Sequence, residues 1–138
     1  MKSVIAVIIV LTVIFVLPVA CSGRGKIHAT SLRSAYDSIR KVKNYIQDDS
    51  KKLEFQIAIG TLQQLKTEEG DTKLFLKTID GKTADEIIAL AKEEVNARIL
   101  KGDPRYSKYQ SWDQMVAELT KNTPRVIGRE RPEHAFEE

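Results

Sequence analysis

The beginning of the chain constrains it most, because its first 20 residues differ in composition from everything that follows. Lys2 precedes an apolar run from Val4 to Ala20, and a polar segment starts after Cys21. A basic start, an apolar centre and a small residue before a cleavage point are the parts of an export signal. The pattern therefore predicts that residues 1–20 are a signal peptide, which is removed and takes no part in the folded domain.

The alternative is an uncleaved helix that spans a membrane. A span needs about 20 apolar residues, and about 17 is the lower limit. The run Val4–Ala20 has 17 residues and carries Pro18 near its end, where proline interrupts a helix. Because the run is short for a span and long enough for the core of a signal peptide, we favour cleavage.

Leu17-Pro18-Val19-Ala20-Cys21 resembles the lipobox of bacterial lipoproteins, in which a cysteine follows a small residue at the end of the apolar core. Pro18 departs from that pattern, since an aliphatic residue is usual at this position. The resemblance implies a diacylglyceryl group on the Cys21 sulfur, cleavage before Cys21 and acylation of the new amino terminus. Cys21 is the only cysteine, and lipidation accounts for an odd cysteine in an exported protein better than a buried thiol does.

Several acyl chains on one residue hold a protein stably at a membrane, so an acylated Cys21 needs no spanning helix. By the same resemblance, Ser22 is compatible with sorting to an outer membrane, because the retention signal for the inner membrane is an aspartate at this position. The expected location is the bacterial cell envelope, on the periplasmic face of the outer membrane.

Without the signal peptide, the chain is long enough for one small domain. The whole chain has a formal charge of +3, and loss of Lys2 with the signal peptide lowers it to +2. No block of basic residues stands out, which argues against nucleic acid as a partner. We expect residues 21–30 to form a flexible tether, residues 31–121 a helical domain, and residues 122–138 a disordered tail, since the tail has few apolar residues and no periodicity.

Apolar residues recur at steps of three or four between residues 31 and 121, which predicts an all-α domain of three to four helices. Thr30 or Ser31 can cap the first helix. The second apolar stripe runs from Leu53 to Leu65, and a polar turn between the two helices favours an antiparallel hairpin. Gly70 can end the second helix in a left-handed conformation. The first stripe comprises Leu32, Ala35, Tyr36, Ile39, Val42 and Ile46.

Two further helices follow, each with a predicted capping box at its start, Thr83 with Glu86 and Ser111 with Gln114. The longer one is expected to carry an ion pair between Glu94 and Arg98 and to end at Gly102. Lys73–Ile79 is ambiguous, but a lone strand would leave backbone groups unpaired. We therefore expect a short helical turn or an extended connection there.

The sequence contains no set of residues that predicts catalysis. Its two histidines, His28 and His134, lie in the expected tether and tail. His and Cys are not spaced as in metal sites, and Asp80-Gly81-Lys82-Thr83 lacks the first glycine of a phosphate-binding loop. We expect no enzyme activity, no metal site and no cofactor.

Three aromatic residues near the last helix, Tyr106, Tyr109 and Trp112, are the candidate binding residues. Rings spaced three apart can form a platform for a sugar or a peptide. The other interpretation, which we favour, is that they cover the open side of the helical core, because large aromatic residues are usually buried.

Ile27-His28-Ala29-Thr30-Ser31, Phe55-Gln56-Ile57-Ala58-Ile59 and the run Gly81-Lys82-Thr83-Ala84-Asp85-Glu86-Ile87-Ile88 resemble a family of small bacterial lipoproteins of unknown function. The resemblance covers about residues 1–95. It implies a lipid anchor and a helical fold, and it brings no activity and no functional residue besides the acylated cysteine.

Three functions are compatible with these features. The first is an anchored protein-interaction or structural module that binds another envelope protein through a helix face. The second is an inhibitor or immunity-like protein that acts on an envelope enzyme. The third is a carrier of a small ligand, with a cleft between the helical hairpin and the next long helix.

The lipobox resemblance generates a direct prediction. In Cys21→Ser the precursor should stay uncleaved or become soluble, because no sulfur is left to carry the acyl chains. Intact-mass analysis of the amino terminus and membrane fractionation test this expectation. The lipobox prediction would be refuted if the variant kept the amino-terminal mass and the membrane fraction of the unaltered protein.

Overall fold

A computed structural model describes residues 25–123, and within this range it is all-α, as predicted. The signal peptide, Cys21 and the tail beyond residue 123 lie outside the described residues. The ambiguous segment Lys73–Ile79 forms most of a helix, which raises the number in the described range to five. These are α1 (Leu32–Tyr45), α2 (Asp49–Glu69), α3 (Thr72–Ile79), α4 (Ala84–Leu100) and α5 (Trp112–Asn122).

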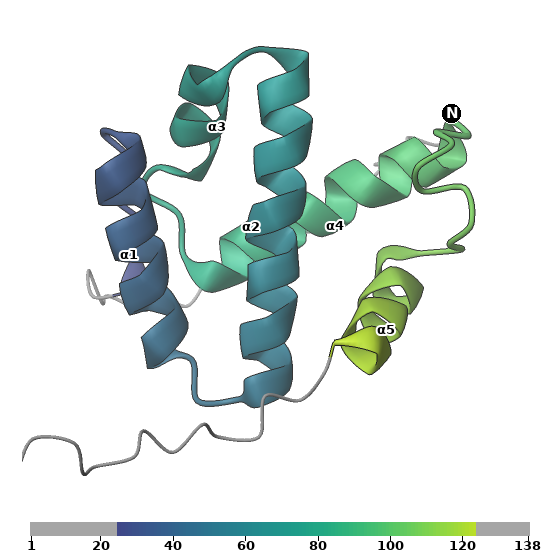
Figure 1. The fold of residues 1–138 in the computed structure, drawn as a ribbon, viewed down its shortest axis with the longest axis horizontal. Helices are drawn as coiled ribbons and strands as arrows, with labels where there is room; N and C mark the ends of the chain where they lie inside the picture. The colour runs from purple at the N-terminus through teal and green to yellow at the C-terminus, as the bar shows by residue number, and fades with distance from the viewer. Residues whose placement is uncertain (1–24, 124–138) are drawn as a thin grey trace, which may run out of the picture.

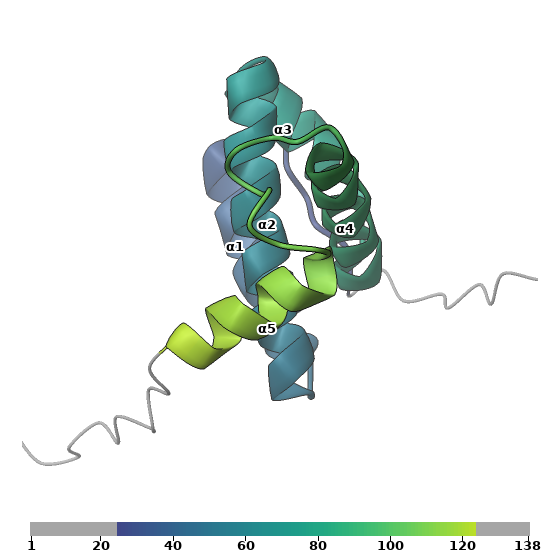
Figure 2. The same ribbon diagram turned by 90° about the vertical axis from the view of Figure 1, so that its right-hand side faces the viewer.

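The long helix α2 lies at the centre of the arrangement (Figure 1). α1 runs antiparallel to α2 on one side, so the predicted hairpin is confirmed, and α5 lies on the opposite side. α4 crosses α2, and α3 packs beside the C-terminal end of α2. Figure 2 shows the segment between α4 and α5 turning back so that α5 lies across α2. The largest fully buried side chains are Trp112, Phe55, Phe75, Ile27, Leu62, Leu65, Ile79, Ile87 and Val95.

Residues 26–30 correct the prediction of a flexible tether. Ile27 is fully buried and Ala29 is almost so, while the residues on either side of each are exposed. The backbone N–H of Ile27 donates to the Lys82 carbonyl over 2.9 Å, and its carbonyl accepts from Gly81 over 2.8 Å. The N–H of Ala29 donates to Asp80 Oδ1 over 2.7 Å. The segment is thus an extended strip that packs on the turn between α3 and α4.

Part of the stripe predicted for α1 is buried as expected, at Ala35 and Val42. The extended strip explains why the buried face also includes a serine. Leu32 and Tyr36 belong to the predicted stripe, yet they are 42% and 47% exposed, whereas Ser38 is buried. The Ser38 hydroxyl accepts from the His28 N–H over 3.0 Å and lies 3.1 Å from the His28 carbonyl. A serine is therefore buried because it satisfies backbone groups of the extended strip, which cannot pair in a sheet.

The helix caps mostly follow the sequence signals. Ser31 caps α1, and Thr83 and Glu86 form the predicted capping box of α4. At α5 the box is only half present, because the Gln114 side chain accepts from the Gln110 N–H and not from that of Ser111.

Of the two glycines expected to end helices, only one adopts a left-handed conformation. Gly102 has a φ of 73°, as expected after α4. Gly70 is not left-handed, since its φ is −145°. A Cβ built there would lie 2.9 Å from Leu74 Cδ2, so close packing against α3 favours glycine at this position.

Truncating Ile27 tests whether residues 26–30 belong to the core. Ile27→Ala in a chain comprising residues 22–138 should lower the free energy of unfolding by about 2–5 kcal/mol, because it empties a fully buried site. Urea denaturation measures the change. The control is Leu100→Ala, at a residue that is 89% exposed, which should change stability by less than about 0.5 kcal/mol. Equal effects of the two substitutions would mean that the segment is a tether after all.

Candidate functional site

The three candidate aromatic residues form part of the core. Tyr106 and Tyr109 are almost fully buried, and Trp112 is completely so. Burial also raises the pKa of the Tyr106 phenol. The rings therefore cover the side of α2 and α4 that the other helices leave open, which agrees with the packing interpretation. They do not form an exposed platform.

Polar neighbours fix Trp112 at the start of α5. Its indole Nε1–H donates to Glu54 Oε1 of α2 over 2.8 Å, and its backbone N–H donates to Asn96 Oδ1 of α4 over 2.9 Å. One residue thus connects α2, α4 and α5. The indole N–H finds the partner that a buried tryptophan requires, which accounts for the polar side chain of Glu54 near the core.

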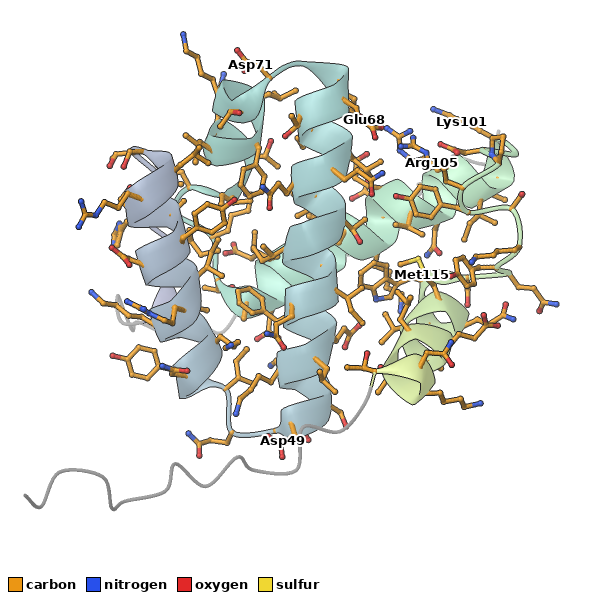
Figure 3. The ribbon with its side chains drawn as sticks, viewed as in Figure 1. Asp49, Glu68, Asp71, Lys101, Arg105 and Met115 are labelled. Atoms are coloured by element: carbon orange, nitrogen blue, oxygen red, sulfur yellow. The ribbon has the colours of Figure 1, made fainter. Side chains whose placement is uncertain are left out.

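Charged side chains join the C-terminal ends of α2 and α4 to the segment that follows α4. Figure 3 shows Arg105 and Glu68 directed toward each other, and the two form an ion pair. Arg98 pairs with Glu69 of α2 and, over 3.2 Å, with Asp103. Because each link joins different elements, this cluster fixes the position of the chain between α4 and the buried tyrosines.

The predicted pair between Glu94 and Arg98 is not part of this cluster. Glu94 accepts instead from Lys66 Nζ over 2.6 Å, and Arg98 bonds to Glu69 and Asp103. Partners on other elements have replaced a partner on the same helix. Burial by itself lowers the pKa of Lys66, but its bonds to Glu69 and Glu94 outweigh that effect and raise it.

Asp103 is the most strongly perturbed carboxyl group of the cluster. The Arg105 side chain, then the Arg105 backbone N–H, and also the bond from Arg98, lower its pKa from 3.8 to about 2. The side chain is only 16% exposed, and it faces two guanidinium groups. The ion pairs of Asp103 thus connect α4 to the segment that follows it.

A polar groove lies on the other side of the molecule, between the extended strip and α1. It has a volume of about 460 Å³ and is open to solvent. His28 lines it with an exposed side chain. Its backbone N–H donates to Ser38, so His28 does not lie in a flexible tether as expected. The other lining residues are Lys26, Ser34, Asp37, Ser38, Lys41, Val42 and Tyr45.

Two large apolar side chains, Leu32 and Tyr36, are exposed on the opposite edge of α1. Ile39 beside them is half-buried against the core. At 100° per residue, Leu32, Tyr36 and Ile39 fall within about 60° of one another around the helix, and Asp37 and Lys41 of the groove fall on the other side. Tyr36 is held at this edge by its hydroxyl, which accepts from Gln63 Nε2 over 2.7 Å. We call Leu32, Tyr36 and Ile39 the α1 edge.

Neither surface contains a cluster of side chains suited to a metal ion. Within residues 25–123, no group of three or more His, Cys, Asp and Glu side chains is arranged to hold a metal ion. In the same range no helix has the length and apolarity to cross a membrane. The two surfaces that remain as candidates for binding are the groove and the α1 edge.

No family model, no curated protein and no solved structure matches this chain. The resemblance to small bacterial lipoproteins stays a hypothesis that rests on the residues quoted for it.

The lowered pKa of Asp103 predicts how stability depends on pH. The folded state favours the ionised carboxylate, so its contribution is present above about pH 4 and is lost as the pH falls toward about 2. Asp103→Asn should lower the free energy of unfolding near neutral pH. Between about pH 4 and pH 2, the stability of this variant should decline less than that of the unaltered protein. Denaturant titrations at several pH values measure both effects.

The control is Asp113→Asn, which removes an exposed ion pair with Lys92. Exposed pairs contribute little, so this variant should keep the decline of the unaltered protein. If Asp103→Asn and the unaltered protein fall in parallel down to about pH 2, Asp103 does not make this contribution.

Proposed function

We propose that this chain is a lipid-anchored protein of the bacterial cell envelope that binds another envelope protein through the α1 edge. The lipobox resemblance at Cys21 supports the anchor. The observation that carries the binding proposal is the exposure of Leu32 and Tyr36, one helical turn apart, on a helix whose buried face is made of smaller residues.

The spacing of the α1 edge fits a known mode of recognition. Leu32, Tyr36 and Ile39 stand at positions i, i+4 and i+7, which is the spacing by which a helix places apolar anchors in the groove of a partner. Tyrosine is also enriched at protein interfaces. Single exposed apolar residues are ordinary on protein surfaces, whereas Leu32 and Tyr36 are exposed side by side, next to the half-buried Ile39.

An inhibitor or immunity-like protein would use the same edge, and the class of the captured partner distinguishes it from a structural module. The carrier hypothesis requires an apolar cleft between the hairpin and α4. The facing sides of α2 and α4 are occupied by buried side chains such as Leu62, Ala91 and Val95, and the polar groove lies elsewhere. We therefore favour a protein partner over a small apolar ligand.

Site-specific photo-crosslinking in the producing bacterium tests the α1 edge. A photoreactive residue at Tyr36 should give an adduct with a discrete envelope protein, identified by mass spectrometry. The same residue at Ala97, an exposed position on α4, is the matched control and should give no such adduct. Identical adduct patterns at both positions, or none at Tyr36, would contradict the proposal.

A second substitution makes the test specific for apolar contact. Leu32→Glu should reduce the Tyr36 adduct at least about tenfold, because it places a charge at the centre of an apolar contact. Leu100→Glu, at an exposed leucine of α4, should leave the adduct unchanged. Thermal unfolding of both variants confirms that each is folded.

A further inference from the structure

The extended strip fixes how far the folded domain begins from the proposed anchor. Ile27 is buried and bonded on both sides to Gly81 and Lys82, so the chain position is set from Lys26 onward. Cys21 precedes Lys26 by five residues. At about 3.6 Å per residue, the leash between them spans at most about 18 Å.

This leash is shorter than the domain. α2 alone has 21 residues, which corresponds to about 30 Å. α4 begins beside Lys26, which forms an isolated backbone bridge with Thr83, and its 17 residues carry the chain about 25 Å away to Lys101. Figure 3 shows Lys101 at the far end of α4, away from α1. The surface around Lys26 is therefore the part of the domain nearest to the anchor.

The chemistry of that surface fits a layer of anionic headgroups. Lys26 and Lys41 line the same groove and are exposed, and neither forms a salt bridge within residues 25–123. Lysine side chains near an anionic membrane surface are attracted over roughly one Debye length. Tyr45 at the rim is 58% exposed, and tyrosine is favoured at the level of the headgroups.

The carboxylates of the same region have partners of their own. Asp37, the one acidic residue that lines the groove, pairs with Arg40 over 3.2 Å. Glu86, near Lys26 and Lys82, accepts from the Thr83 N–H over 2.8 Å as part of the α4 cap. Asp85 pairs with Lys51 over 2.6 Å. The two groove lysines, which form no salt bridge within residues 25–123, are thus available to an external anion.

We propose that the groove between residues 26–28 and α1 is the membrane-facing surface of the domain, and that Lys26 and Lys41 contact the headgroups of anionic phospholipids. The proposal rests on the proposed anchoring at Cys21. The orientation adds to the proposed function: the groove side of α1 faces the lipid, and the α1 edge is left free for a partner protein.

Amine labelling of the acylated protein tests the orientation. The purified, acylated chain is reconstituted in vesicles of phosphatidylglycerol and phosphatidylcholine or of phosphatidylcholine alone, and acetylation of each lysine is followed by mass spectrometry. In the anionic vesicles, Lys26 and Lys41 should react at least about fivefold more slowly than in the chain without acyl groups, the factor expected for one lysine–surface contact. Lys101, which is also exposed, is the internal control and should react at an unchanged rate.

A longer leash tests whether the protection of the two lysines depends on the short distance between the anchor and the groove. Insertion of about 30 Gly and Ser residues after Gly23 should bring the rates of Lys26 and Lys41 back toward that of the unacylated chain, because the effective concentration of the headgroups at the groove falls. The intact mass of the same sample reports whether Cys21 is acylated.

Each other outcome overturns a defined part of the proposal. If the acyl mass is present and all three lysines react at unchanged rates, the orientation is wrong and the anchoring stands. Equal protection in phosphatidylcholine alone would overturn the assignment to anionic headgroups. A missing acyl mass would remove the anchoring and the orientation together.

Discussion

The fold depends on the packing of the four other helices around α2. Phe55, Leu62 and Leu65 of this helix are fully buried, and α2 contacts each of the other four helices. Its polar residues extend the same role, since Glu54 bonds to the buried Trp112 and Glu68 pairs with Arg105. Because apolar burial supplies most of the stability of a small domain, a helix that shares a core with all its neighbours holds them in one unit.

Local signals predicted most of the helices, and non-local hydrogen bonds account for the main errors. The capping residues at Ser31 and Thr83 mark the starts of α1 and α4, because a cap depends on neighbours in the sequence. Residues 26–30 were mistaken for a tether because their bonding partners lie in other parts of the chain. A signal was present: Ile27 and Ala29 alternate with polar residues, which is the period of an extended segment with one buried face.

The candidate surfaces were harder to predict, because each is assembled by tertiary structure. The periodicity of α1 predicted a buried stripe that includes Leu32 and Tyr36, and both are exposed. The contact of Ser38 with the extended strip extends the buried face of α1 on the side away from these two residues. Likewise, the sequence offers Arg98 a partner four residues away, while the fold offers carboxylates of α2 and of the segment after α4. The aromatic residues were interpreted correctly because bulk alone favours their burial.

The extended strip also has a consequence for the order of folding. The bond between Ala29 and Asp80 joins residues 51 positions apart, so the α3–α4 turn must form before the strip has a surface on which to dock. Contacts between distant residues are entropically costly to close and tend to form late. We expect the hairpin and α4 to assemble first and the amino-terminal strip to complete the structure in the final step.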